Sequence, residues 1–217
     1  TSAVLSGTVV TDNGGTIQER GFVWLQGSGV PTIDSNKIKA TGTTGDYTIT
    51  LEGLEPNQTY SYRAYAYNSL GVSYGQTKTF TTSLAAPSLG TTSVSNVASR
   101  SATLNGVVAS DGGETISEVG FYYSTSETVD PSSSQKVNIK YSDYQKSAKG
   151  YASSMMYSTS TASTETTLDS GDIFSIDVFD LALKTRYYVK SYAVNSVGTS
   201  YGEVVNFMTQ GEIPVVN

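Results

Sequence analysis

The 217-residue sequence contains neither cysteine nor histidine. Without cysteine there are no disulfides, thiolate nucleophiles or thiolate metal sites. Without histidine the chain lacks the usual general base and the commonest metal ligand. No run of 18 apolar residues occurs, so no segment is expected to cross a membrane as a helix. With no histidine to activate a serine and no assembled catalytic motif, we expect the chain not to be an enzyme and to need no cofactor.

Charged residues are also scarce. They make up 15% of the chain, and 13 Lys/Arg against 19 Asp/Glu leave a net charge of −6. Nucleic acids and anionic membranes are bound through clustered Lys and Arg, and no such cluster is present, so we expect neither partner. What is abundant is tyrosine, with 16 residues, and glycine, with 21. Together with many Thr and Val, this composition favours strands and turns over helices.

Two segments of the sequence occur twice. Residues 3–22 return 99 positions later as residues 102–121, with 11 of the 20 positions identical. Residues 60–75 return 127 positions later as residues 187–202. The larger shift means that the second copy carries 28 extra residues between its two halves. Such repetition predicts tandem domains of one fold.

Both copies have the pattern of short β-strands. Ala3, Leu5, Gly7 and Val9 alternate with polar residues and so share one face of a strand, as the matching residues of the second copy do. Gly- and Asn-rich turns follow, since these residues tolerate positive φ. Short strands between frequent turns predict an all-β fold of two antiparallel β-sandwiches.

The expected boundaries are a first module over 1–84, a second over 85–210 and a stretch over 211–217 that is either a tail, which could cover an edge, or the start of a further segment, which we favour. Residues 90–97 predict a first strand in the second module, for which the first module has no equivalent. Either a strand lies upstream of this sequence or the first module is one strand short, with an edge that needs protection. We expect the chain to be part of a longer multi-domain protein.

The stretch Leu54-Glu-Pro-Asn-Gln-Thr-Tyr60, followed by Arg63-Ala-Tyr-Ala-Tyr-Asn-Ser-Leu-Gly71, resembles the fibronectin type III fold. With Gly14-Gly-Thr-Ile-Gln-Glu-Arg-Gly-Phe22, it is similar to the fibronectin III-like repeats of secreted and surface lipoproteins from Bacteroides-type bacteria. The second module keeps the corner tyrosine, Tyr187, but lacks the proline. The resemblance implies export, residence at the cell envelope or outside the cell, and a spacer or ligand-binding role. It also implies a corner tyrosine whose hydroxyl bonds to the backbone a few residues upstream.

The extra residues of the second module form the first candidate site, an insert at about 127–170. Long loops in compact domains are often functional, and tyrosine is an effective contact residue. The predicted ligand contacts are Tyr141, Tyr144, Tyr151 and Tyr157. The alternative is an added hairpin that covers a sheet edge or packs on the first module, with residues 137–141 as an extra strand.

A second candidate is the outward face of the long strands, which carries four tyrosines: Tyr65, Tyr67, Tyr188 and Tyr192. Flat aromatic faces stack on sugar rings or partner side chains. The alternative, which we favour, is cross-strand pairing with neighbours such as Tyr122.

Acidic residues give a weaker third candidate. Four aspartates crowd the strand that leads to the second corner, Asp169, Asp172, Asp177 and Asp180. Hard cations need several oxygen ligands, but no Asp-x-Asp-x-Asp loop is present, so turn formation is favoured and we expect no metal site. Glu19 and Glu118 occupy matching repeat positions, which favours a role in the fold.

We therefore predict a non-catalytic cell-surface or extracellular binding or adhesion protein that recognises a glycan or protein ligand. The alternative is a structural spacer that holds another domain away from the cell surface. The sequence predicts localisation at the envelope surface or outside the cell, with any lipid anchor in a segment outside this sequence, and no membrane insertion by these residues.

Overall fold

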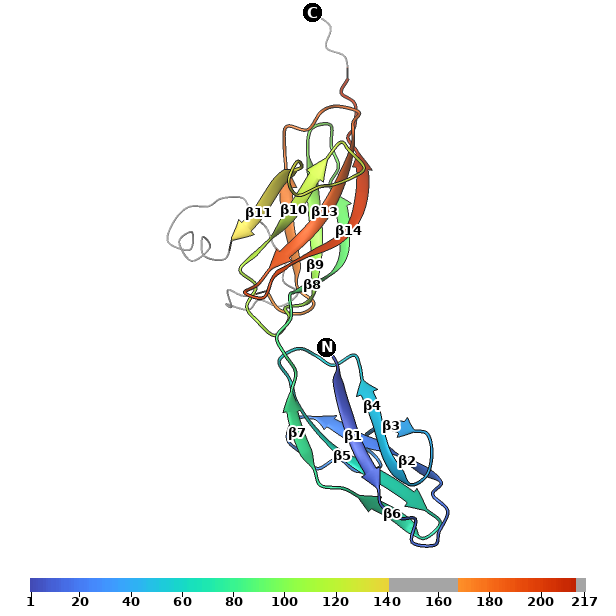
Figure 1. Ribbon diagram of the computed structural model, residues 1–217. Helices are drawn as coiled ribbons and strands as arrows, with labels where there is room; N and C mark the ends of the chain where they lie inside the picture. The colour runs from blue at the N-terminus through green and yellow to red at the C-terminus, as the bar shows by residue number, and fades with distance from the viewer. Residues whose placement is uncertain (141–167, 214–217) are drawn as a thin grey trace, which may run out of the picture. The chain divides into compact units, whose positions relative to one another are not determined.

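The computed structural model describes residues 1–140 and 168–213. The chain forms two compact units, Thr1–Leu84 and Ala85–Asn217. All the regular secondary structure of the described residues is β-strand, and every strand pair is antiparallel (Figure 1). The predicted fold class, two tandem antiparallel β-sandwiches, is confirmed.

Unit 1 packs a two-stranded sheet against a five-stranded one. The small sheet pairs β1 (Ala3–Val9) with β4 (Gly45–Leu51). The larger sheet has the order β3-β2-β5-β6, and β7 also pairs with β5. Its strands are β2 (Glu19–Gln26), β3 (Asn36–Ala40), β5 (Thr59–Asn68), β6 (Gly71–Tyr74) and β7 (Lys78–Thr81).

Unit 2 repeats this plan with one more strand in the smaller sheet, whose order is β12-β9-β8. Its strands are β8 (Ser88–Ser95), β9 (Ala102–Ser110) and β12 (Ile173–Val178). The other sheet has the order β11-β10-β13-β14. It consists of β10 (Glu118–Ser124), β11 (Gln135–Lys140), β13 (Arg186–Val194) and β14 (Thr199–Met208).

The repeated alternation of apolar residues becomes the core of each sandwich, because alternate side chains of a strand point to one face. In unit 1 Phe22, 1% exposed, lies 5.1 Å from Tyr47 between ring centroids. The matching pair in unit 2, Phe121 and Phe174, lies at 5.2 Å, with both rings fully buried. Burying one such side chain stabilises the fold by about 1.5–3 kcal/mol.

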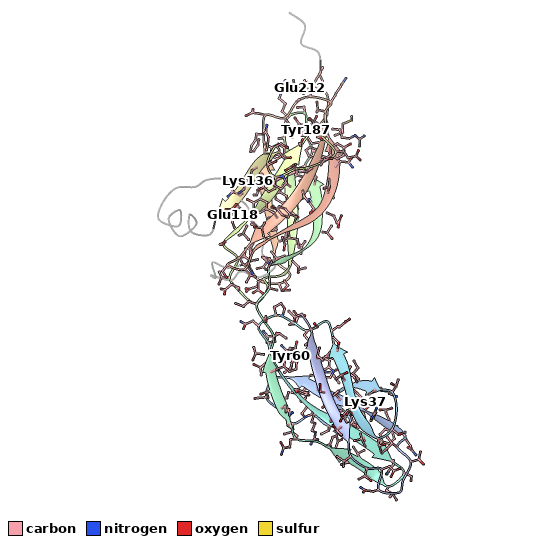
Figure 2. The ribbon with its side chains drawn as sticks, viewed as in Figure 1. Lys37, Tyr60, Glu118, Lys136, Tyr187 and Glu212 are labelled. Atoms are coloured by element: carbon pink, nitrogen blue, oxygen red, sulfur yellow. The ribbon has the colours of Figure 1, made fainter. Side chains whose placement is uncertain are left out.

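A tyrosine fixes the same corner in each unit. The amide of Glu55 donates to the Tyr60 hydroxyl at 3.0 Å, and the amide of Ala182 donates to the Tyr187 hydroxyl at 2.9 Å. The two tyrosines are labelled in Figure 2. The corner predicted from the resemblance is thus present in both units, and the missing proline of unit 2 does not abolish it.

The insert is shorter than the sequence predicted. Strand β11 pairs with β10 in the way that β3 pairs with β2, for example Gly120 with Asn138 and Gly21 with Lys39. Residues 137–140 of the expected strand therefore lie in β11, which belongs to the shared fold and is not an addition, while Tyr141 lies outside the described residues. The error arose because β3 and β11 have little sequence similarity, so the repeat gave no alignment there. The 28 additional residues must follow Lys140.

Candidate functional site

The four tyrosines predicted to bind ligand, Tyr141, Tyr144, Tyr151 and Tyr157, lie outside the described residues. What the structure gives is the place where their segment is attached. It leaves the end of β11, an edge strand, and returns at Leu168, which is 3% exposed and belongs to the core of unit 2. Unit 1 makes the same connection, from β3 to β4, with residues 41–44 alone.

The short connection of unit 1 is held by a buried arginine. Arg20, 6% exposed, donates to four backbone carbonyls in and next to this loop, those of Thr41, Thr43, Thr44 and Gly45, at 2.7–3.1 Å. Charge-assisted hydrogen bonds of this kind are stronger than neutral ones. The loop conformation of unit 1 is therefore tied to one side chain that sequence analysis did not single out.

Unit 2 has Val119 where unit 1 has Arg20, because the two positions are 99 residues apart in the aligned repeat. Val119 is fully buried in the hydrophobic core. The arginine that fixes the β3–β4 loop is thus absent from the one unit in which this connection is long. The contrast between these two residues was visible in the repeat, but only the structure shows what the arginine binds.

The outward-facing tyrosines at the centre of each sheet are not available to a ligand. Tyr65 and Tyr192 are each 1% exposed. Each lies opposite a glycine of the neighbouring strand, Gly21 or Gly120. A Cβ on either glycine would come within 2.0–2.2 Å of a backbone oxygen of the edge strand, so these positions require glycine. Tyr192 also lies 4.9 Å from Tyr122, as the cross-strand interpretation predicted.

The hydroxyls of these two tyrosines donate to the repeated glutamates. Tyr65 binds Glu19 at 2.6 Å and Tyr192 binds Glu118. Lys37 and Lys39 pair with Glu19. Lys136 pairs with Glu118 at 2.7 Å, and both residues are labelled in Figure 2. The expected role of both glutamates in the fold is confirmed.

This environment changes the acidity of the glutamate in unit 1. The hydrogen bond from Lys39 and that from Tyr65 lower the pKa of Glu19 from 4.5 to about 2. Burial, together with the hydrogen bond to the ionised Glu19, raises the pKa of Tyr65 well above 10. At neutral pH the Glu19 side chain is therefore a carboxylate that accepts from Tyr65, Lys37 and Lys39. This arrangement is suited to joining strands and not to proton transfer.

The sheet of unit 2 also carries partly exposed rings. Tyr122 and Tyr201 lie 6.3 Å apart, and Tyr201 is 45% exposed. Lys190 lies 5.3 Å from the Tyr201 ring centroid, within the range of a cation–π contact. These rings form an accessible aromatic surface on the sheet that also contains β11, the strand after which the insert begins.

Unit 1 has a groove of about 480 Å³. It runs between the end of β1, the turn that follows β1, and the β5–β6 hairpin. Its lining includes Thr8, Val9, Asp12, Asn13, Ile17, Ala64, Asn68, Gly71 and Gly75. Asp12 is the only charged residue in its lining. Sequence analysis left open whether an upstream strand covers the edge of β1, and it did not predict this groove.

The aspartates of unit 2 have structural contacts. Asp172 Oδ2 accepts a hydrogen bond from the Asp169 amide at 2.9 Å, and Asp177 Oδ1 accepts one from the Thr103 hydroxyl at 2.7 Å. Asp180 has a φ of 56° in the turn after β12. Within residues 1–140 and 168–213, no group of three Asp, Glu, His or Cys side chains is arranged to hold a metal ion.

In the part of the chain that the structure describes, no helix has the length and apolar character needed to cross a membrane.

Comparison with known proteins gives a likeness of fold only. No family model matches the sequence, and no curated protein matches it. Among solved structures, the chain is similar to the chicken CNTN1 FN1-FN3 domains, with 15% identity and a TM-score of 0.37. The match covers 95% of this chain and 62% of that one, so the chain spans less than two thirds of that structure's length.

Proposed function

We propose that the chain is a non-catalytic binding or adhesion protein, exposed on the cell surface or outside the cell, whose ligand is a glycan or a protein. The observation that supports this proposal is the additional segment of unit 2. Four residues suffice to join β3 to β4 in unit 1, whereas 32 residues separate β11 from β12 in unit 2. The sandwich does not need the difference, and long connections in compact domains often carry function.

The chemistry of the segment suits contact with a ligand. Tyr141, Tyr144, Tyr151 and Tyr157 offer large apolar rings with a polar hydroxyl and few rotatable bonds, so that ordering them on binding costs little entropy. We propose these four side chains as the contacts. Tyr122 and Tyr201 belong to the sheet that contains β11. They would contact the ligand only if it extends past β11 over this sheet.

The test compares the intact chain with a chain that lacks residues 141–167, in which Lys140 is joined to Leu168. This deletion leaves five residues between the strands, where unit 1 has four. Both chains are screened on a glycan array and on a panel of immobilised extracellular proteins. We expect the intact chain to bind and the shortened chain to lose binding by at least tenfold while its unit 2 melts within a few degrees of the original.

A fourfold Tyr→Ala variant at the proposed contacts is expected to reproduce the loss without shortening the chain. Tyr122→Ala with Tyr201→Ala serves as the matched control on the sheet. If the fourfold variant binds normally and the sheet variant does not, the proposed contacts are wrong. If the shortened chain binds as tightly as the intact one, the segment is not the binding site.

The alternative proposal is a structural spacer that separates another domain from the cell surface. The tandem repetition of one fold favours it, because repeated modules add length without adding a new activity. It predicts that no array component binds either chain, and that inserting or removing one unit in a longer protein changes reach but not affinity.

A further inference from the structure

The turn that follows β1 contains an asparagine directly before a glycine, Asn13-Gly14. We propose that this pair is a site of spontaneous covalent modification, at which Asn13 loses its side-chain amide and becomes aspartate or isoaspartate. The modification is separate from the binding role considered above and does not depend on it. The chain has a second Asn-Gly pair, Asn105-Gly106, and the fold protects that pair from the same reaction.

The reaction needs an accessible backbone nitrogen beside the asparagine side chain. The amide nitrogen of Gly14 attacks Cγ of Asn13, its proton passes to a base, and ammonia leaves, so that a cyclic succinimide forms. Water then opens the ring at either carbonyl. One opening gives aspartate, and the other gives isoaspartate, in which the main chain runs through the former side chain. Glycine favours the attack because it has no Cβ to shield its nitrogen.

The middle of the turn leaves room for this reaction. Asn13 and Gly14 are both exposed, and a Cβ built on Gly14 would meet nothing within 4 Å. The Gly14 amide donates to Asp12 Oδ1 at 3.0 Å, which places a proton acceptor on the nitrogen that attacks. Neither residue of the pair belongs to a strand, so ring formation breaks no hydrogen bond of a sheet.

The ends of the turn are held independently of the reacting groups. The Gly15 amide donates to the Asp12 carbonyl at 3.1 Å, and the Asn68 side-chain amide donates to the carbonyls of Asp12 and Gly15, each at 3.1 Å. These hydrogen bonds involve neither the Asn13 side chain nor the Gly14 nitrogen. The modified turn therefore stays attached to the end of β5, and we expect unit 1 to stay folded.

The second Asn-Gly pair lies in the middle of β9, where the fold blocks the reaction. Gly106 pairs with β8 on one side and with β12 on the other, and a Cβ on it would clash with the Phe174 ring, so a succinimide has no room. The Asn105 side chain is also held, because it donates to the Ser95 hydroxyl at 3.1 Å and accepts from the Ser175 hydroxyl at 2.8 Å. Attack there requires the sheet to open, and core strands open only rarely.

Modification changes both the charge and the backbone of this turn. It adds a negative charge next to Asp12 in a chain whose net charge is −6. In the isoaspartate form it also adds a methylene group to the main chain. Unit 2 has Gly112 at the position that matches Asn13, with a φ of 79° where Asn13 has 50°. At this position the change is therefore confined to unit 1.

The test follows both asparagines in one sample. The intact chain is kept at mildly alkaline pH, in buffer or in guanidinium chloride, and is then digested with trypsin. Cleavage after arginine and lysine gives residues 1–20, in which Asn13 is the one asparagine, and residues 101–136, in which Asn105 is the one asparagine. In buffer we expect Asn13 to convert at least about tenfold faster than Asn105, measured by peptide mass and by labelling with isoaspartyl methyltransferase. In denaturant both should convert at similar rates, because only the fold separates them.

Two variants locate the reaction. Asn13→Gly copies the residue of unit 2 and is expected to abolish the labelling of residues 1–20, whereas Asn105→Ser is expected to leave that labelling unchanged. The aged original chain should elute later in anion exchange and keep the unfolding transition reported by Trp24 fluorescence. Equal conversion of both asparagines in the folded chain, or conversion of Asn13 in denaturant only, would overturn the proposal. It would also be overturned if the labelling persisted in Asn13→Gly.

Discussion

Units 1 and 2 share a fold and differ in two places. One is the pairing of β1 and of its equivalent β9, and the other is the connection that follows β3 and its equivalent β11. In the described residues β1 pairs with β4 alone, with a groove of about 480 Å³ beside it, whereas β9 of unit 2 pairs with both β12 and β8. Unit 2 lacks the arginine that ties down the β3–β4 loop of unit 1 and carries the additional segment there. The comparison teaches that a repeated sandwich tolerates change at an edge and at one loop, while the paired glycines, tyrosines and glutamates of its larger sheet stay the same.

The difference that we expect to matter most for stability is the exchange of Arg20 and Val119. Val119→Arg would place a charge at a fully buried position of the unit 2 core and is expected to destabilise that unit by about 3–5 kcal/mol. Arg20→Val would remove the hydrogen bonds to the loop of unit 1 at a cost of about 2–4 kcal/mol.

Urea unfolding distinguishes the two units in this experiment. The single tryptophan, Trp24, lies in β2 and reports on unit 1, while far-ultraviolet circular dichroism follows both units. Arg20→Val should therefore shift the fluorescence transition, and Val119→Arg should shift only the transition of unit 2. An Arg20→Val chain as stable as the original would show that the loop does not depend on the arginine.

A smaller and equal effect is expected at the two corners. Tyr60→Phe and Tyr187→Phe each remove one hydroxyl that accepts a backbone amide, and each is expected to cost about 1–2 kcal/mol. Tyr123→Phe is the control, since its hydroxyl bond to Gln135 is exposed and its loss should cost about 0.5 kcal/mol or less. If only Tyr60→Phe destabilises its unit, the proline of the first corner matters more than the shared hydrogen bond.

The smallest of these effects is the dependence on pH. The pKa of Glu19 is lowered from 4.5 to about 2 in the folded chain, so its stabilisation is complete above about pH 4.5 and is lost as the pH falls towards 2. Because Lys39 is well exposed, the contribution at neutral pH is expected to be about 0.5–1 kcal/mol. Glu19→Gln should flatten the stability of unit 1 between pH 5 and pH 2, measured by Trp24 fluorescence. A variant whose stability still falls steeply over that range would assign the pH dependence to other carboxylates.

Much of each sandwich was predictable because its constraints are local. The alternation of Ala3, Leu5, Gly7 and Val9 follows from strand geometry, and the corner tyrosines follow from a motif of seven residues. The repeat itself favoured a role in the fold for Glu19 and Glu118, which their contacts with tyrosine and lysine confirm. The edge strands β3 and β11 were harder to predict from the repeat. Edge positions face solvent and tolerate many side chains, so the two strands have little sequence similarity.

The features of the candidate sites also divide into those that the sequence determined and those that only the tertiary structure decided. The sequence alone determined that there are two modules, that the second is 28 residues longer, and that thiol and histidine chemistry is absent. Only the tertiary structure decided that Tyr65 and Tyr192 are covered, that Arg20 binds a loop more than 20 residues away, and that a groove lies beside β1. The physical reason is that burial, hydrogen bonding across strands and the shape of a groove depend on residues brought together from distant parts of the chain, whereas length, composition and alternation are properties of neighbours in sequence.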